Sequence, residues 1–178
     1  MRLLLSLVFS LAPACAHSQE NIIILEHAQA RLDPHWIIIN HIPDGEYTSA
    51  VSAILADQDG KPRDDKSMVL FGVCDVSGHA GLTVFQSITS RHDKQNERRE
   101  GPWVINYAVE PKEDGYALLV DAMQYSEKHK CYYWVRRGRY IESADYTLTD
   151  NDVNEILALT KKMETLDQET PPQPDNNE

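Results

Sequence analysis

Short apolar runs rich in β-branched residues recur along this chain, and clusters of Asp, Asn, Gly, Pro and other polar residues separate them. Runs of this length and composition predict β-strands. They occupy residues 21–25, 36–42, 47–55, 67–74, 82–88, 103–109 and 131–135, and the runs at 67–74 and 82–88 are expected to form a hairpin. We therefore expect a fold built mainly of antiparallel β-sheet.

Two further segments predict helices. Tyr116 to Lys128 is rich in Ala, Leu, Met, Gln, Glu and Lys, which favour helix, and its apolar residues recur at helical spacing. Near the C-terminus, Thr149 can cap a helix with Asp152 three residues later, as in a capping box. The predicted fold class is α+β, mainly antiparallel β-sheet with two packed helices, the last one C-terminal, and one disulfide.

The N-terminal residues have the pattern of an export signal. Arg2 precedes an apolar run from Leu3 to Leu11, which is too short to span a bilayer. We expect residues 1–18 to be a cleavable secretory signal peptide and the product to be periplasmic or secreted. Cleavage after Ala16 and after Ser18 both fit. The alternative is a bacterial lipoprotein with a lipid anchor at Cys15.

The rest of the chain is long enough for one domain with its own core. We expect residues 19–166 to form a single globular α+β domain and residues 167–178 to be a disordered, acidic, Pro-rich tail.

Two cysteines remain in the expected mature domain, Cys74 and Cys131. An even pair in an exported protein predicts a disulfide. Closing so long a loop would stabilise the fold by about 4 kcal/mol. A redox-active pair would favour a close C-x-x-C motif, which the sequence lacks.

The chain is acidic, with 28 Asp and Glu against 17 Lys and Arg and a formal net charge of -11. This balance argues against nucleic acid as a partner. It suits a basic protein partner, and it also serves ordinary solubility.

Motifs that carry chemistry are missing from the sequence. The acidic stretch from Asp57 has Lys61 and Pro62 where a calcium loop needs a ligand and a glycine. The histidines are scattered, and Ser77 with His79 does not define a triad. We therefore expect no catalytic, cofactor-binding or metal-binding residues. The alternative is a small secreted hydrolase whose site is assembled from distant residues such as His79, His92 and Asp93.

Basic residues concentrate in two segments, and aromatic residues interleave with the second. Arginine with exposed tyrosine or tryptophan is typical of protein interfaces. The opposing interpretation is a set of core-facing aromatics with solvated arginines on the other face. The residues predicted to bind a partner are Arg91, Arg98, Arg99, Trp103, Tyr132, Trp134, Arg136 and Arg137.

The order of elements resembles a group of bacterial periplasmic proteins associated with type VI secretion. The matching features are a strand that ends in cysteine at residues 69–74, an Arg-x-Asp triplet at 91–93, Trp103 in a later strand, and a closing helix after 146–148. The resemblance implies an accessory role without catalysis, and it transfers no active-site residue.

The resulting hypothesis is an exported, non-enzymatic protein that binds another cell-envelope or secreted protein. Two versions fit: a secretion-apparatus accessory protein, or an inhibitor or immunity protein against a basic toxin or cell-wall hydrolase. The acidic balance favours the inhibitor version, because opposite charge speeds capture.

Overall fold

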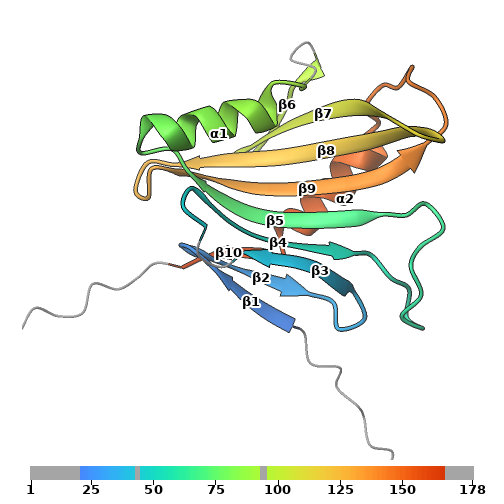
Figure 1. The fold of residues 1–178 in the computed structure, drawn as a ribbon, viewed down its shortest axis with the longest axis horizontal. Coiled ribbons are helices and arrows are strands. Elements are labelled where there is room, and N and C mark those ends of the chain that lie inside the picture. The colour runs from blue at the N-terminus through green and yellow to red at the C-terminus, as the bar shows by residue number, and fades with distance from the viewer. Residues whose placement is uncertain (1–20, 43–44, 93–95, 167–178) are drawn as a thin grey trace, which may run out of the picture.

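The computed structural model describes residues 21–42, 45–92 and 96–166. The predicted signal peptide, Cys15 and the predicted tail therefore lie outside the described residues. Figure 1 shows a large twisted sheet with helices beside it and a small sheet at one edge. The strands and helices are β1 (Asn21–Leu25), β2 (Ala28–Leu32), β3 (Ile37–Ile42), β4 (Thr48–Ile54), β5 (Met68–Asp75), α1 (His79–Thr89), β6 (Arg98–Glu100), β7 (Trp103–Lys112), β8 (Gly115–Ser126), β9 (Cys131–Ile141), α2 (Asp150–Thr160) and β10 (Met163–Thr165).

All strand pairs are antiparallel. In the part of the chain that the structure describes, the large sheet has seven strands in the order β3-β4-β5-β9-β8-β7-β6, and the small sheet has three in the order β1-β2-β10. In the middle of this sheet, β9 pairs with β5 over eight residues and with β8 over eleven. This block carries the core.

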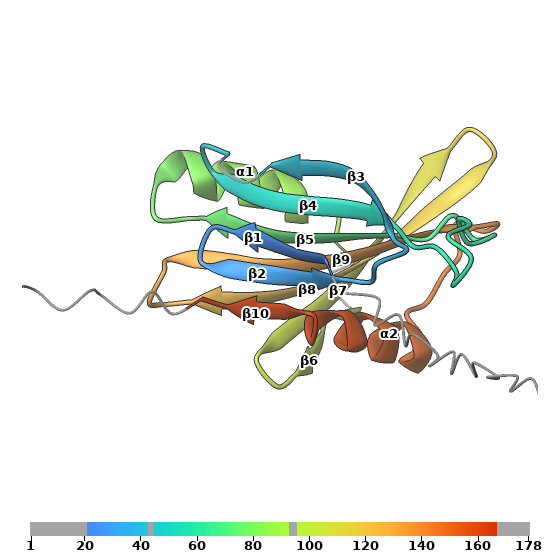
Figure 2. The same cartoon turned by 90° about the horizontal axis from the view of Figure 1, so that it is seen from below.

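The two faces of the large sheet have different covers. Phe71, Val135 and Ala122 lie opposite one another across β5, β9 and β8 and point to one face. They join residues of α2 and of the small sheet in one hydrophobic core. The other face carries α1, whose Phe85 stacks on Tyr132 of β9 with ring centroids 3.9 Å apart. Figure 2 shows α1 and α2 on opposite sides of the sheet.

The C-terminal helix is confirmed, together with its cap. The Thr149 hydroxyl accepts a hydrogen bond from the backbone N–H of Asp152, and the Asp152 carboxylate accepts one from the backbone N–H of Thr149. This reciprocal pair satisfies two N–H groups that a helix start otherwise leaves free. Among the described residues, no helix combines the length and the apolar character needed to cross a membrane.

The helix predicted at residues 116–128 is wrong, because this segment is the strand β8. Leu118, Val120 and Ala122 point into the core, while Asp121 and Met123 are buried on the α1 face. A strand that is covered on both faces has no simple alternation of polar and apolar residues. The composition of β8 is typical of a helix, and the missing alternation gave no sign of a strand.

The strand predicted at residues 82–88 is wrong in the opposite sense, because the segment lies in α1. Gly81 lies inside this helix, where an added Cβ would come 2.0 Å from the backbone oxygen of Asp75. The glycine therefore allows α1 to pack closely on the end of β5. The predicted pair of helices and mostly antiparallel sheet stands, although the first helix lies elsewhere in the chain.

The predicted disulfide is also wrong, because Cys74 and Cys131 are both buried free thiols. In the register of β5 with β9, Cys74 lies opposite Tyr132 and Cys131 lies opposite Asp75. Residues directly opposite share a face and successive residues alternate. The two thiols therefore point to opposite faces of the sheet.

Candidate functional site

Four of the residues predicted to bind a partner lie in β9, and they do not share a face. The register with β5 places Tyr132, Trp134 and Arg136 on the α1 face of the sheet and Arg137 on the opposite one. Trp134 is buried, and Tyr132 is partly covered by α1. Tyr132 and Trp134 are thus at least partly covered by the rest of the molecule, but Arg136 shares their face, whereas the opposing interpretation placed the arginines on the other face.

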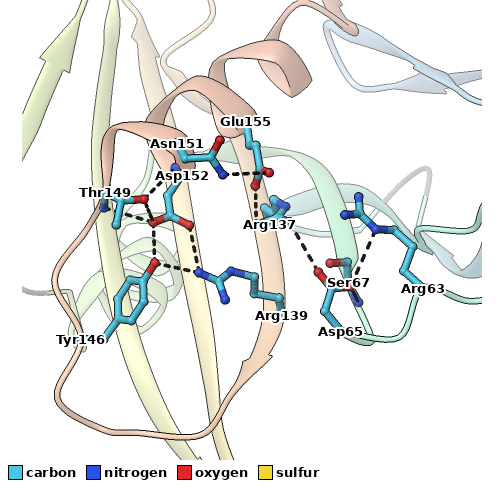
Figure 3. A network of polar contacts seen from close by, with 10 residues as sticks. All are labelled: Arg63, Asp65, Ser67, Arg137, Arg139, Tyr146, Thr149, Asn151, Asp152 and Glu155. Carbon is cyan, nitrogen blue, oxygen red and sulfur yellow. Dashed lines mark hydrogen bonds and ion pairs between the residues drawn. The ribbon is translucent and has the colours of Figure 1, made fainter.

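Arg137 is an interior residue whose side chain is only 5% exposed. It forms ion pairs with Glu155 of α2, at 2.7 Å, and with Asp65, at 3.7 Å. Figure 3 shows these pairs next to a second group, in which Arg139 of β9 pairs with Asp152 of α2. In this structure, Arg137 fastens α2 to the large sheet.

The other four predicted residues lie around the far edge of the sheet, in and near β6 and β7. The side chains of Arg91 and Arg99 are 70% and 74% exposed, and each pairs with a nearby glutamate. Arg98 pairs with Asp150 of α2, and Trp103 packs partly against the core. That these residues bind a partner remains a prediction.

A buried polar cluster on the α1 face gathers around Asp121, whose side chain is fully buried. Its carboxylate accepts hydrogen bonds from Nε1 of Trp134 at 2.8 Å and from Nε and Nη2 of Arg136 at 2.7 and 2.8 Å. His92 Nε2 lies 2.6 Å from Oδ2 of the same carboxylate, which is also the oxygen that accepts from Arg136 Nη2. This cluster fastens the chain after α1 to the middle of the sheet.

The surroundings of Asp121 keep its carboxylate ionised. Burial would raise the pKa of Asp121, but the hydrogen bonds from Arg136, His92 and Trp134 outweigh burial and hold the pKa below its usual value. Because both oxygens already accept protein donors, the carboxylate has little capacity left to bind a ligand or move a proton. We interpret the cluster as structural.

Sequence reasoning missed this cluster. Asp121 stands in the apolar run from Leu118 to Met123, and a charged residue in such a run indicates a buried partner. The signal could be used only if the run was predicted as a strand. Its partners His92, Trp134 and Arg136 lie in other segments, and only the pairing of strands brings them next to Asp121.

The hydrolase alternative is not supported by the geometry. His79 begins α1 and His92 follows its C-terminal end, so the two histidines lie at opposite ends of a helix about 16 Å long. His92 is held by Asp121, and Asp93 lies outside the described residues. Within the described part of the chain, no group of three or more His, Cys, Asp or Glu is placed to hold a metal ion.

The exposed apolar surface gathers at a different place, on the outer strands of the two sheets. Among the described residues, eight large hydrophobic residues are exposed; six of them are isoleucines of β1 and β3, and the other two lie elsewhere. We call these six the isoleucine edge: Ile22, Ile24, Ile37, Ile38, Ile39 and Ile42. The most exposed are Ile24, at 56%, and Ile39, at 51%.

Both strands of the isoleucine edge have an unpaired side in the described structure. β3 pairs with β4 alone, and β1 pairs with β2 alone. Proteins usually protect such edges with charged residues, proline or bulges. β3 has a bulge between Ile38 and Asn40, but it contains neither proline nor a charged residue apart from His41 when protonated.

A groove of about 820 Å³ separates β1 from the end of β3. One side is β1 from Ile22 to Leu25, continued by Glu26 and His27. The other side is formed by His41 near the end of β3 and by Gly45 and Glu46 after it. The groove is thus apolar along β1 and acidic at one end.

The acidic end is fixed by contacts to the rest of the molecule. The backbone N–H of Glu26 donates to Oγ of Ser49 at the start of β4, which places Glu26 near the end of β3. The Glu46 carboxylate accepts a hydrogen bond from the hydroxyl of Tyr47 at 2.7 Å. Within the described residues, no ion pair joins either carboxylate to an arginine or a lysine.

The architecture defines an α+β protein with a helix on each face of an antiparallel sheet. No family model matches the chain, and no curated protein sequence matches it. Two solved structures do: the Ran-binding protein Mog1p of Saccharomyces cerevisiae and a mutant of the protein Mog1. Both align with a TM-score of 0.51 at 10% sequence identity, over 84% of this chain and 96–97% of the other chain. The likeness shows a shared fold.

These comparisons correct the predicted family and roles. The resemblance to type VI secretion accessory proteins is wrong, because the solved structures that share the fold are those of Mog1, described in one of them as a Ran-binding protein. The two predicted roles, a secretion accessory protein and an inhibitor or immunity protein, are wrong on the same finding. The finding also contradicts the predicted periplasmic or secreted location.

Proposed function

We propose that this protein acts by binding another protein, without catalysis, and that the isoleucine edge is its docking surface. The observation that carries the proposal is the concentration of exposed isoleucines on two strands with unpaired sides that flank one groove. The shared fold adds support, because one of the two solved structures that have it is described as that of a Ran-binding protein.

The size of the edge suits a partner of moderate affinity. Covering half of an isoleucine side chain contributes about 1 kcal/mol, so six such residues contribute on the order of 6 kcal/mol before the costs of association. Backbone hydrogen bonds to an unpaired strand add to this. A micromolar dissociation constant needs about 8 kcal/mol of net binding free energy, so we expect the edge alone to bind its partner more weakly than that.

The test compares edge variants with a matched control. Ile39→Lys and Ile42→Lys place a charge on the edge, whereas Leu82→Lys places one on α1, where the leucine has a similar exposure of 40%. The full-length protein and each variant are used to capture partners, and the affinity of each captured partner is then measured. A partner lost by both edge variants and kept by Leu82→Lys supports the proposal. A partner that binds all three variants equally overturns it.

The predicted arginine-rich surface is a separate proposal for the same class of function. It depends on Arg91 and Arg99, which have the most exposed side chains among the predicted arginines, at 70% and 74%. Arg91→Glu with Arg99→Glu should weaken binding of an acidic partner and leave an isoleucine-edge partner unaffected. Unchanged affinity for every captured partner would remove this surface.

A further inference from the structure

Resting on the proposed function, we infer how a partner protein occupies the groove. The partner inserts an extended segment that adds to the free side of β1 as an antiparallel strand. The segment begins with a lysine or arginine beside Glu26 and Glu46. The exposed isoleucines of β3 remain available to other parts of the same partner.

The free side of β1 carries unpaired backbone groups. The backbone N–H of Arg31 in β2 donates to the carbonyl of Lys162, so it points toward β10 and away from β1. Ile22 lies opposite Arg31, and Ile24 lies opposite Gln29, two positions along β2. Because directly opposite residues of an antiparallel pair bond to each other only at every second position, the N–H and C=O groups of Ile22 and Ile24 point away from β2.

This side of β1 is the one that lines the groove. Figure 1 shows β1 at the outer edge of the small sheet. Four successive residues of β1, 22–25, line the groove, although successive side chains point to opposite faces of a sheet. This is the arrangement expected when a groove runs along the edge of a strand. At the end of β1, Glu26 donates its backbone N–H to Oγ of Ser49 in β4, so an added segment begins just before that contact.

An extended segment suits this edge better than a helix does. Only an extended backbone can exchange a row of hydrogen bonds with a strand edge. On the inner face the segment meets Ile23 and Leu25, which pack against the core. On the outer face it meets Ile22 and Ile24, which are 50% and 56% exposed. Apolar side chains of the segment therefore find apolar neighbours on both faces of the small sheet.

The direction of the segment follows from strand pairing. Antiparallel pairs are more stable per residue than parallel ones, and every strand pair in the described structure is antiparallel. β1 runs toward Glu26, so an antiparallel segment begins at that end. Glu46 lies in the loop between β3 and β4, close in sequence to Ser49, which contacts Glu26. The segment therefore begins where both glutamates line the groove.

Charge selects the residue at that beginning. Glu26 is half-exposed, with 45% of its side chain accessible, and it approaches His27 at 3.6 Å. A basic side chain placed there meets the carboxylates of Glu26 and Glu46. The net charge of -11 also steers a basic segment toward the protein.

The first test uses the full-length protein and a defined probe, the acetylated and amidated peptide Lys-Ile-Thr-Val-Thr-Ile-Thr with a fluorophore at its C-terminus. Fluorescence anisotropy gives its affinity. Replacing the lysine by glutamine should weaken binding about fivefold, as expected for a half-exposed ion pair. Moving the lysine to the C-terminal end should weaken binding to the same extent. Equal affinity of all three peptides overturns the inferred charge and direction.

Variants of the two glutamates locate the basic residue. The double variant Glu26→Gln/Glu46→Gln should bind the lysine and glutamine peptides equally. The control is Glu113→Gln, which changes an exposed glutamate between β7 and β8 and should keep the fivefold preference. A preference that survives the double variant overturns the placement of the basic residue beside Glu26 and Glu46.

A proline in β1 tests the backbone pairing. Ile24→Pro removes an N–H that points into the groove and leaves the ladder with β2 complete, as proline does on edge strands. It should weaken peptide binding at least tenfold, whereas Ile24→Val, which keeps the N–H, should weaken it less than twofold. Circular dichroism checks that both variants are folded. Equal affinity of the two variants overturns strand addition to β1.

A change in the peptide tests the same pairing without altering the protein. N-methylation of alternate peptide bonds can be made in two sets, and only one set points its N–H groups at β1. One set should therefore bind at least tenfold more weakly than the other. Equal binding by both sets overturns strand addition.

The failures of the two proposals are distinguishable. If captured partners still depend on Ile39 and Ile42 but the peptides do not respond to Ile24→Pro, the docking surface stands and this inference falls. If captured partners bind Ile39→Lys and Ile42→Lys as they bind the parent, the docking surface falls and this inference falls with it.

Two other occupants of the groove are outcomes of the same measurements. A stable dimer in light scattering that Ile24→Pro dissociates would assign the groove to a second copy of the chain. A higher affinity of Arg2→Glu for the lysine peptide would assign it to the N-terminal residues of the chain itself. Either result overturns a partner segment as the occupant, whereas a monomer and an unchanged affinity support it.

Discussion

The middle of the large sheet and its β3 edge invert the usual preference of residue types. In the middle, Asp121 is fully buried between β9 and β7. At the edge, Ile39 is half-exposed although its side chain is entirely apolar. Charged residues are almost never fully buried unless they are paired, and Asp121 is paired three ways.

The difference teaches that position in the sheet, and not residue type, decides burial here. A central strand has neighbours on both sides and covers on both faces, so even a carboxylate there finds enough donors. An edge strand has one neighbour, so its apolar side chains stay accessible until something docks on them. The predictions below test this contrast from its largest expected effect to its smallest.

Phe71→Ala in the middle strand β5 should have the largest effect. Phe71 is fully buried in the core, and truncating a buried phenylalanine costs about 3–5 kcal/mol in the free energy of unfolding. Urea unfolding followed by circular dichroism measures it. A loss below about 1 kcal/mol would show that the middle of the sheet is not the main source of stability.

Asp121→Asn should come next, at about 3 kcal/mol, because it leaves Arg136 and His92 beside a group that no longer carries the opposing charge. The native pKa of Asp121 lies below the unfolded value, so its contribution is present above about pH 4 and is lost as the pH falls through the native pKa.

The pH dependence sharpens that prediction. The difference in unfolding free energy between the parent and Asp121→Asn should be largest at pH 7 and should shrink below about pH 4. Unfolding curves at pH 7, 5 and 3 measure it. A difference that stays constant over this range would contradict an ionised, paired Asp121.

Thr149→Ala should have an intermediate effect on α2, which packs on the middle strands β8 and β9. The Thr149 hydroxyl caps this helix, and losing such a cap costs about 1 kcal/mol. Thr149→Ser, which retains the hydroxyl, is the control for thermal and urea unfolding. Equal losses from both variants would mean that the methyl group, and not the cap, matters.

Ile39→Lys should have the smallest effect on folding, within about 0.5 kcal/mol, because surface substitutions are usually this mild. The comparison with Phe71→Ala is then direct, since one apolar residue supports the fold and the other is available for binding. A loss of more than about 2 kcal/mol would place Ile39 in the packed structure and weaken the proposed docking surface.

The sequence allowed the general architecture to be predicted, but not the positions of all its elements. The C-terminal helix was readable because Thr149 and Asp152 form a local signal within one turn. β8 was not readable, because its cover on the α1 face comes from segments distant in sequence. Local composition cannot report what packs on a strand from elsewhere in the chain.

The candidate site divides in the same way. The isoleucine run from Ile37 to Ile39 was predicted as a strand, but the sequence does not tell whether a strand is central or at an edge. That distinction depends on the order of strands in the sheet, which here puts β3 first and β5 third. The predicted aromatic residues of β9 are mostly covered for the same reason, since β9 takes a central place.

The placement of the two thiols has a consequence for the redox behaviour of the protein. Cys74 and Cys131 belong to neighbouring strands but face opposite sides of the sheet. Burial raises the pKa of both thiols, that of Cys131 to about 11, so they stay protonated and unreactive near neutral pH. The described fold therefore forms without an oxidant and contains no disulfide that a reductant could cleave. Its melting temperature should be the same with and without dithiothreitol.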